Sequence, residues 1–504
     1  MMTPTNNLLH FQIFASAFLR HDTSLLPAIA KSLRILLAVC GQPEIIISYG
    51  KHSENILQMI ESLGPIGKIK ATTAKEEPVQ FACLLILDRD KDYASSMLTP
   101  SIYAGLLLEV FERNASEILL ETQHNKIRAQ KLKIFENPQQ AATKQTTKTI
   151  ANSAKEDLKP IRLQLNSFND EIYGENRYKH FAQASSLIRA QAKAIGLEVH
   201  KLNDMKLDEM HDYVARKLPK IAELKSKVLK HLKASEIVIE MLAGNFRKLQ
   251  QLEQNILNNS SRKRLLAEIE EILATDGQQW NTLRLLCLLH LCSSLSGGEE
   301  LSQFVRNYTN MFGHQHVGMF QRLATAGLLP QLVVEDKLNK SAAKLLSNLP
   351  LSKFVQTEFQ ANANRLKLLL NETAGDAAQN AALNACPSYV FNNLYIPLIA
   401  QLCSITLKAA GNEEFMAKLG MIDKLRLHVP YEDSHSFNVC SIKELKRSVF
   451  PLKRQHMLVY VVGGITYAEI AACNMISKLL GAQVVLASDT ILAGCDLLSA
   501  AAGI

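Results

Sequence analysis

The sequence predicts an α/β protein whose parallel sheet is split by a large, mainly helical insertion. A strand–turn–helix–strand unit stands near the end of the chain, where the apolar run 457–462 precedes Gly463-Gly464 and another apolar run follows at 484–486. Strand and helix patterns also alternate at the start, yet most of residues 115–385 have helical spacing. Because short apolar runs without alternation are typical of strands covered on both faces, we expect 81–87, 457–462 and 484–486 in one parallel sheet.

The first part of the split domain is expected to be residues 1–114. Its predicted elements are a helix at 25–39, a strand at 45–48, a helix at 55–63 and a buried strand at 81–87. Thr99-Pro100 is expected to begin a further helix that runs to Phe111, because proline is favoured just inside a helix start.

The insertion is expected to be residues 115–385. Strand-like pieces at 126–135 and 161–165 enclose residues 137–159, which have almost no large apolar side chain and are therefore expected to form a flexible loop. Apolar residues at helical spacing then predict a helical hairpin at about 178–218, with its tip near 197–206. Gly196 is expected to end the first helix, and Pro219 to end or kink the second stripe.

The second part of the split domain is expected to be residues 386–504. Thr466 can cap the helix after the two glycines, and Glu469 three positions later completes the pattern of a capping box.

Composition favours a cytoplasmic protein. The chain has 504 residues, of which 47% are apolar, and a formal net charge of +8, which is too modest to indicate a nucleic-acid partner. Nine cysteines without a Cys-x-x-Cys pair favour free thiols in a reducing compartment. No signal peptide pattern opens the sequence.

A search for catalytic motifs leaves one candidate, the pair Asp88 and Asp90 at the end of a predicted strand, where α/β enzymes place metal or phosphate ligands. No phosphate-binding loop, nucleophile elbow or His-Glu-x-x-His accompanies them. One hypothesis is therefore a metal-dependent hydrolase with a helical lid. The favoured one is that Asp88 caps backbone amides or pairs with Arg89. His314 and His316 are expected to be surface residues, and we expect no metal or cofactor.

Five stretches resemble a known family. Residues 87–92 (LDRDKD), followed by 98–100 (LTP) and 103–106 (YAGL), are similar to a characteristic stretch of the Sec/Munc (SM) family of SNARE regulators, and 463–470 (GGITYAEI) is similar to its C-terminal signature. Residues 163–167, 283–289 and 388–391 resemble the vacuolar protein sorting branch, which includes the SM subunit of the HOPS, or class C, tethering complex and its close paralogue.

The resemblance implies an arch-shaped fold in which a split α/β second domain is interrupted by a helical third domain. Family members carry about one further α/β domain before the point that matches residue 1, so the chain is expected to lack this first domain. That domain belongs to the cleft that holds a syntaxin-type SNARE. The sequence is then either a truncated form or that of a protein with half of the cleft.

The function implied by the resemblance is that of a non-enzymatic SNARE-assembly factor. Its partners would be syntaxin-type and vesicle-type SNAREs and a helical scaffold subunit of a HOPS-like tethering complex, with indirect recruitment to late endosome, lysosome or vacuole membranes. Two sets of residues are assigned on this basis. The SNARE-binding hairpin would use Lys193, His200, Lys206, Met210 and Arg216, and the tethering-subunit interface would use Tyr389, Phe391 and Tyr395. A plain helical scaffold without a SNARE role is a third hypothesis.

Overall fold

The computed structural model describes residues 12–64, 81–111, 113–114, 117–120, 161–200, 218–275, 279–293, 295, 298–331, 357–370, 386–409, 413–430, 437–440 and 456–503. The chain falls into two compact units, residues 1–100 with 250–504, and residues 101–249. The domain boundaries predicted after residue 114 and before residue 386 remain a prediction. The expected strand at 126–135 and loop at 137–159 lie outside the described residues.

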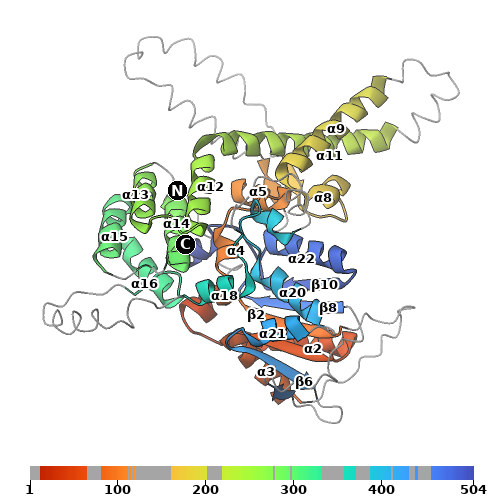
Figure 1. The fold of residues 1–504 in the computed structure, drawn as a ribbon. Helices are drawn as coiled ribbons and strands as arrows, with labels where there is room; N and C mark the ends of the chain where they lie inside the picture. The colour runs from red at the N-terminus through yellow and green to blue at the C-terminus, as the bar shows by residue number, and fades with distance from the viewer. Residues whose placement is uncertain are drawn as a thin grey trace. The chain divides into compact units, whose positions relative to one another are not determined.

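The first unit contains a six-stranded sheet in the order β10-β8-β2-β1-β6-β7 (Figure 1). β10, β8, β2 and β1 are parallel, and β6 and β7 are added antiparallel. The prediction of one parallel sheet for 81–87, 457–462 and 484–486 is therefore confirmed. The strands are β1 (Ile45–Tyr49), β2 (Cys83–Asp88), β6 (Leu425–Pro430), β7 (Phe437–Cys440), β8 (His456–Val462) and β10 (Gln483–Ser488).

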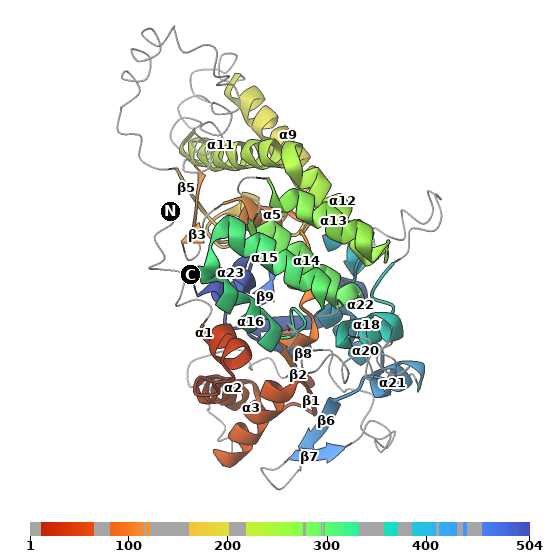
Figure 2. The same cartoon turned by 90° about the vertical axis from the view of Figure 1, so that its left-hand side faces the viewer.

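Helices cover both faces of this sheet. Figure 2 shows α2 (Leu26–Cys40) and α3 (Lys51–Ser62) on one side of the strands and α20 (Leu398–Ala409) and α22 (Tyr467–Leu480) on the other. Every residue of β1 and β2 is buried, which explains why these strands have apolar runs instead of alternation.

The predicted capping box at the start of α22 is confirmed. The Thr466 hydroxyl accepts a hydrogen bond from the Glu469 amide at 3.2 Å, and the Glu469 carboxylate accepts one from the Thr466 amide at 2.8 Å. Gly463 and Gly464 both have positive φ, of 94° and 108°, and a Cβ on either would lie within 2.7 Å of a neighbouring side chain. Both positions therefore require glycine. Two short elements complete this part of the chain, β9 (Ile465–Thr466) with β11 (Ile491–Leu492), and α23 (Asp496–Ala502).

The further helices of residues 250–504 include a buried arginine. Arg284, 2% exposed, donates hydrogen bonds to the Glu253 carboxylate at 3.0 Å and to the Thr99 hydroxyl at 2.8 Å. Glu253 also accepts from the Thr99 amide and hydroxyl. The helices are α12 (Arg247–Leu257), which begins before residue 250, α13 (Arg262–Leu273), α14 (Gln279–Ser293), α15 (Glu299–Phe312), α16 (Val317–Thr325), α18 (Glu358–Leu366) and α21 (Glu413–Gly420).

The predicted helix start at Thr99-Pro100 is wrong. The helix begins at Tyr103, with Ile102 at its N-cap, because the Thr99 groups that could cap a helix are bound to Glu253. A short helix, α4 (Ala94–Met97), precedes this segment.

The second unit combines a small antiparallel sheet with a helical hairpin. The strands are β3 (Arg113–Asn114), β4 (Glu117–Leu119) and β5 (Arg162–Gln164), in that order. The helices are α5 (Tyr103–Val110), α8 (Glu171–Asn176), α9 (Phe181–His200) and α11 (Leu218–Met241). No helix among the described residues of the chain is long and apolar enough to cross a bilayer.

The α9–α11 pair matches the predicted hairpin in part. Ala184, Ile188 and Ile195 are buried, as the helical spacing predicted. Gly196 does not end α9, which continues to His200, so that prediction is wrong; interior glycine costs a helix about 1 kcal/mol, which packing can offset. Pro219 is the second residue of α11, where a missing backbone donor is tolerated. The predicted tip, from residue 201, lies outside the described residues.

Candidate functional site

Asp88 closes the N-terminus of α3 and leaves no room for a ligand. Its carboxylate is 0% exposed and accepts hydrogen bonds from the amides of His52 at 2.7 Å and Ser53 at 2.8 Å, and from the Ser53 hydroxyl. A Cβ on Gly50, where φ is 132°, would lie 2.2 Å from the carboxylate carbon, so this position must be glycine. The prediction that Asp88 caps backbone amides is confirmed. The alternative, pairing with Arg89, is wrong.

Asp90 lies beside charged side chains and not at the N-terminus of α3. Its carboxylate lies 3.5 Å from the Lys91 ammonium, which also binds Glu358 at 3.1 Å. Burial raises the pKa of Asp90, and it raises that of Asp88 to about 7, with the Asp90 charge adding to the shift at Asp88. Among the described residues, no group of three His, Cys, Asp or Glu side chains could hold a metal ion. The two carboxylates therefore give no support to a metal-dependent hydrolase.

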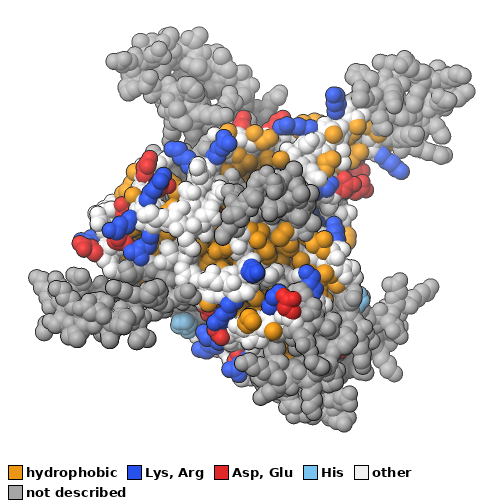
Figure 3. Space-filling model, viewed as in Figure 1, with side chains coloured by type: hydrophobic (Ala, Val, Ile, Leu, Met, Phe, Trp, Pro, Cys, Tyr) orange, Lys and Arg blue, Asp and Glu red, His pale blue; other side chains and the backbone are white. Residues whose placement is uncertain are grey.

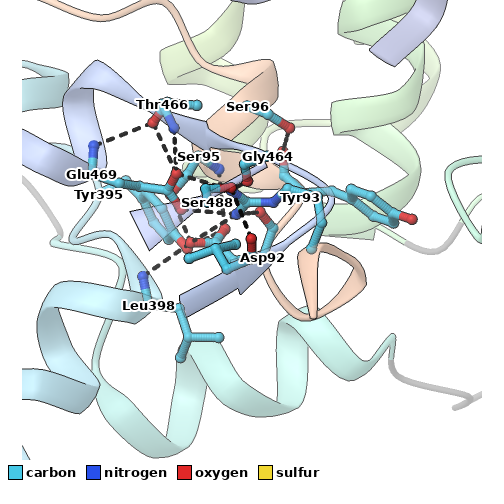
Figure 4. Close-up of polar contacts among 12 residues, drawn as sticks. Asp92, Tyr93, Ser95, Ser96, Tyr395, Leu398, Gly464, Thr466, Glu469 and Ser488 are labelled. Carbon is cyan, nitrogen blue, oxygen red and sulfur yellow. Dashed lines mark hydrogen bonds and ion pairs between the residues drawn. The ribbon is translucent and has the colours of Figure 1, made fainter. Parts of the chain in front are cut away.

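Asp92, the last residue of the stretch 87–92, belongs to a buried polar network that joins distant parts of the chain (Figure 4). Arg89 donates two hydrogen bonds to the Glu469 carboxylate, at 2.8 and 2.9 Å, across 380 positions of sequence, and both side chains are 0% exposed. Arg89 also donates to the carbonyl oxygens of Gly464 and Asp92. Burial opposes the charge of Arg89, but Glu469 and Asp92 outweigh it, so the pKa of Arg89 is raised.

Asp92 carries the network into the segment before α20. Its carboxylate accepts hydrogen bonds from the Tyr395 hydroxyl at 2.8 Å and from the Leu398 amide at 3.0 Å, besides the amide and hydroxyl of Ser95. Burial, and then the charge of Asp92, raise the pKa of Tyr395. We call Arg89, Asp92, Tyr395 and Glu469 the buried joint. It fixes β2 to the segments that begin α20 and α22, and has no opening for a substrate.

The buried joint changes the interpretation of the predicted tethering residues. Tyr395 is 0% exposed and Phe391 is 3% exposed, with their ring centroids 5.9 Å apart. Their burial argues against a role as exposed anchors, because each already packs within the first unit. Tyr389 is half-buried and keeps part of its surface. The sequence contained no signal that Tyr395 binds Asp92, since the two residues are 303 positions apart.

Of the five predicted SNARE-binding residues, Lys193 is the one whose side chain lies in the described part of the structure. Lys193 is exposed on α9, away from the buried face formed by Ala184, Ile188 and Ile195. His200 is the last residue of α9, but its side chain is outside the described part. Lys206, Met210 and Arg216 also lie outside the described residues.

A buried polar chain holds the base of the hairpin. The Tyr103 hydroxyl lies 2.8 Å from His231 Nδ1, and His231 Nε2 lies 3.0 Å from the Asp170 carboxylate. Asp170 also caps α8 by accepting from the Tyr173 amide at 3.0 Å. Because His231 is 0% exposed, this chain fixes the rotation of α11 relative to α5 and α8. Sequence analysis did not identify these residues.

Comparison with known proteins gives a match along nearly the whole chain. The model of the Sec1 family matches residues 2–500. Vacuolar protein sorting-associated protein 33B of Danio rerio is 22% identical over 493 residues, which cover 95% of this chain and 72% of that protein. Vacuolar protein sorting-associated protein 33A of Rattus norvegicus is 24% identical over 498 residues, covering 97% of this chain and 72% of that protein.

Solved structures are similar in fold. The Unc18–syntaxin 1 complex from Monosiga brevicollis matches with a TM-score of 0.59 and 14% identity, covering 98% of this chain and 74% of that one. The SM protein Vps45 in complex with the Qa SNARE Tlg2 matches with a TM-score of 0.54 and 14% identity, covering 95% of this chain and 70% of that one.

Proposed function

Because this chain belongs to the Sec1 family, we propose that it is a non-enzymatic factor that binds SNAREs and promotes their assembly during vesicle docking and fusion. The relatives named for vacuolar protein sorting, and the similar structures solved with a SNARE, support this proposal. The environment of Asp88 is consistent with a non-enzymatic role. Both oxygens of its carboxylate already accept hydrogen bonds from backbone amides of α3.

The α9–α11 hairpin is the observation that carries the mechanism. Its inner positions are buried, whereas Lys193 of α9 and Lys220 and Lys225 of α11 are exposed. Basic, helical surfaces suit the acidic, amphipathic outer faces of SNARE helices. Disordered segments that fold on binding lose several kcal/mol to ordering, and a rigid surface that aligns two of them reduces this cost. We assign recognition to Lys193, His200, Lys206, Met210 and Arg216.

Association with a tethering complex belongs to the same proposal. A helical scaffold subunit would recruit the chain to late endosome, lysosome or vacuole membranes, in keeping with the names of the relatives. Of the three aromatic residues considered for this contact, Tyr389 has accessible surface, so it is the anchor candidate that remains. The split-domain organisation, with parts 1–114 and 386–504 around 115–385, is proposed with it.

A reconstituted assembly reaction tests this function. Fluorescently labelled syntaxin-type and vesicle-type SNARE motifs are mixed with and without the purified full chain, and the rate of their assembly is followed by energy transfer. We expect faster assembly and direct binding of at least one SNARE. An Ile188→Asp variant, which places a charge on the buried side of α9, is the matched control. SNARE assembly in its presence should be no faster than assembly without the chain. An unchanged rate together with no binding would contradict the proposal.

A further inference from the structure

Tyr103, the first residue of α5, contacts both helices of the hairpin. Its ring stacks on that of Phe181, the first residue of α9, with the ring centroids 6.2 Å apart and the planes inclined by 16°. Its hydroxyl lies 2.8 Å from Nδ1 of His231, which belongs to α11. Tyr103 and His231 are both 0% exposed. One buried side chain therefore connects the two helices whose exposed basic residues carry the proposed function.

The start of α9 is held beside α5 by the backbone. The Phe181 amide donates a hydrogen bond to the carbonyl oxygen of Ser101 at 2.8 Å. The Tyr103 amide donates one to the carbonyl oxygen of Lys179 at 3.0 Å. Because these bonds join main-chain groups, the position of α9 relative to α5 does not depend on the hydroxyl of Tyr103.

α11 is joined to the same region through side chains. Around His231, its packed side consists of Val228, Ala234 and Val238, each at most 1% exposed. Apolar packing alone leaves a helix some freedom to rotate, whereas a buried polar group needs its partners at fixed distances. His231 is therefore the residue that defines the rotation of α11.

The two hydrogen bonds of His231 have fixed directions. Burial opposes the charge of Asp170, but the contacts with His231 outweigh it, so the pKa of Asp170 is lowered. An ionised carboxylate only accepts, so Nε2 of His231 donates to Asp170. In the neutral ring Nδ1 then accepts from the Tyr103 hydroxyl, which keeps its proton because burial raises the pKa of Tyr103. Without that hydroxyl, Nδ1 would lose its donor.

Small movements of α11 at His231 become large at its exposed surface. Figure 3 shows Lys and Arg side chains on the surface along α9 and α11. A helix with its side chains has a radius of about 5 Å, so a rotation of about 10° moves this surface by about 1 Å. The exposed Lys220 lies about 16 Å along the axis from His231, so a tilt of about 5° displaces it by about 1.4 Å. Shifts of about 1 Å are enough to slow a reaction between two aligned partners strongly.

We propose that Tyr103, through His231, is a positioning residue that sets the rotation of α11 relative to α9 and thereby aligns two SNARE helices for assembly. This inference rests on the proposed function and divides it into two parts. The exposed basic residues supply the affinity for one SNARE, and the buried chain of Tyr103, His231 and Asp170 supplies the geometry in which two SNAREs meet. Substitutions should therefore separate SNARE binding from the acceleration of assembly.

Tyr103→Phe in the full chain separates the two parts. The variant keeps the ring that stacks on Phe181 and removes the hydroxyl that binds His231. In the reconstituted reaction, with labelled syntaxin-type and vesicle-type SNARE motifs and saturating chain, we expect the acceleration of assembly to fall about tenfold. The affinity for either SNARE alone should be unchanged. Val228→Ala, which removes apolar contacts about one turn from His231, is the matched control; it should lower the melting temperature but keep the wild-type acceleration.

The distance between the two helices gives a readout that needs no SNARE. Spin labels introduced as non-natural amino acids at the exposed positions Ala190 of α9 and Lys225 of α11 report this distance by double electron–electron resonance. We expect one narrow distance distribution for the otherwise wild-type chain and for Val228→Ala. Tyr103→Phe should give a broader or displaced distribution, because the buried polar chain no longer fixes α11.

The results distinguish this inference from the proposed function. If the wild-type chain accelerates assembly and Tyr103→Phe does so equally, or if the distance distribution does not change, the positioning role is rejected and the proposed function is retained. Equal losses of affinity and acceleration in Tyr103→Phe would show that the residue supports only the fold, which also rejects the positioning role. A wild-type chain that neither binds a SNARE nor accelerates assembly would reject the proposed function and the positioning role together.

Discussion

The buried joint and the exposed faces of the hairpin use charged side chains for opposite purposes. In the buried joint, Arg89 and Glu469 are both 0% exposed and bind each other in fixed geometry. On α9 and α11, Lys193, Lys220 and Lys225 are exposed to solvent. A buried charge without its partner destabilises the fold strongly, whereas exposed charges act through screened attraction. The difference separates charges that maintain the structure from charges that are available for binding.

The largest expected effect is on stability, from Glu469→Gln. This change removes the carboxylate that binds the buried Arg89 guanidinium at 2.8 Å and leaves only Asp92, at 4.0 Å, beside that charge. Breaking a buried ion pair by removing one partner typically costs about 3–5 kcal/mol. Differential scanning calorimetry should show that the first unfolding transition of the variant occurs at a lower temperature than that of the wild-type chain. Lys418→Gln, which breaks an ion pair between the exposed side chains of Lys418 and Glu414, is the control and should leave the transition unchanged. Equal effects of the two variants would remove the distinction between the regions.

A smaller loss of stability is expected from Asp88→Asn. The asparagine keeps one acceptor oxygen, but its amide nitrogen cannot accept from the α3 amides, so we expect a loss of about 1–3 kcal/mol. The measurement is urea-induced unfolding of the variant and the wild-type chain. The same proteins should have no nucleotide hydrolysis with Mg²⁺ or Mn²⁺. A metal-dependent hydrolysis that Asp88→Asn abolishes would revive the enzyme hypothesis.

The stability of the chain should also depend on pH through the buried residue His428 of β6. This histidine is 7% exposed and lies 2.8 Å from the Ser48 hydroxyl, and burial, followed by the charge of Arg426, lowers its pKa to about 4. Between pH 6.5 and 4 the unfolded chain binds a proton that the folded chain does not. The contribution of His428 to stability is therefore complete above pH 6.5 and is lost as the pH falls toward 4.

Melting temperatures measured from pH 4 to 8 check this expectation. His428→Gln should have a shallower decrease below pH 6.5 than the wild-type chain, while His314→Gln, a change at an exposed position, should follow the wild type. An identical pH dependence for His428→Gln and the wild type would show that this buried histidine does not contribute to acid sensitivity.

The sequence predicted the sheet because its signals are local. Apolar runs, the two glycines and the Thr466–Glu469 spacing each depend on a few neighbouring residues, and all were confirmed. The partners of Arg89 and Asp92 depend on contacts across more than 300 positions, which local patterns do not encode. For the same reason Thr99 was misassigned as a helix start, since its partner Glu253 is 154 positions away. Tyr395 shows that an aromatic residue assigned to an interface from a family resemblance can instead be part of the core.

The most direct test of the central claim compares SNARE affinity with stability in one variant. Lys193→Glu, Lys206→Glu and Arg216→Glu together should weaken binding of a vesicle-type SNARE and change its salt dependence, because the attraction of exposed charges is screened by salt. The melting temperature should hardly change, since surface substitutions usually alter stability by about 0.5 kcal/mol or less. The account predicts lost affinity in a folded protein. Unchanged affinity in a folded triple variant would contradict it and favour a plain scaffold.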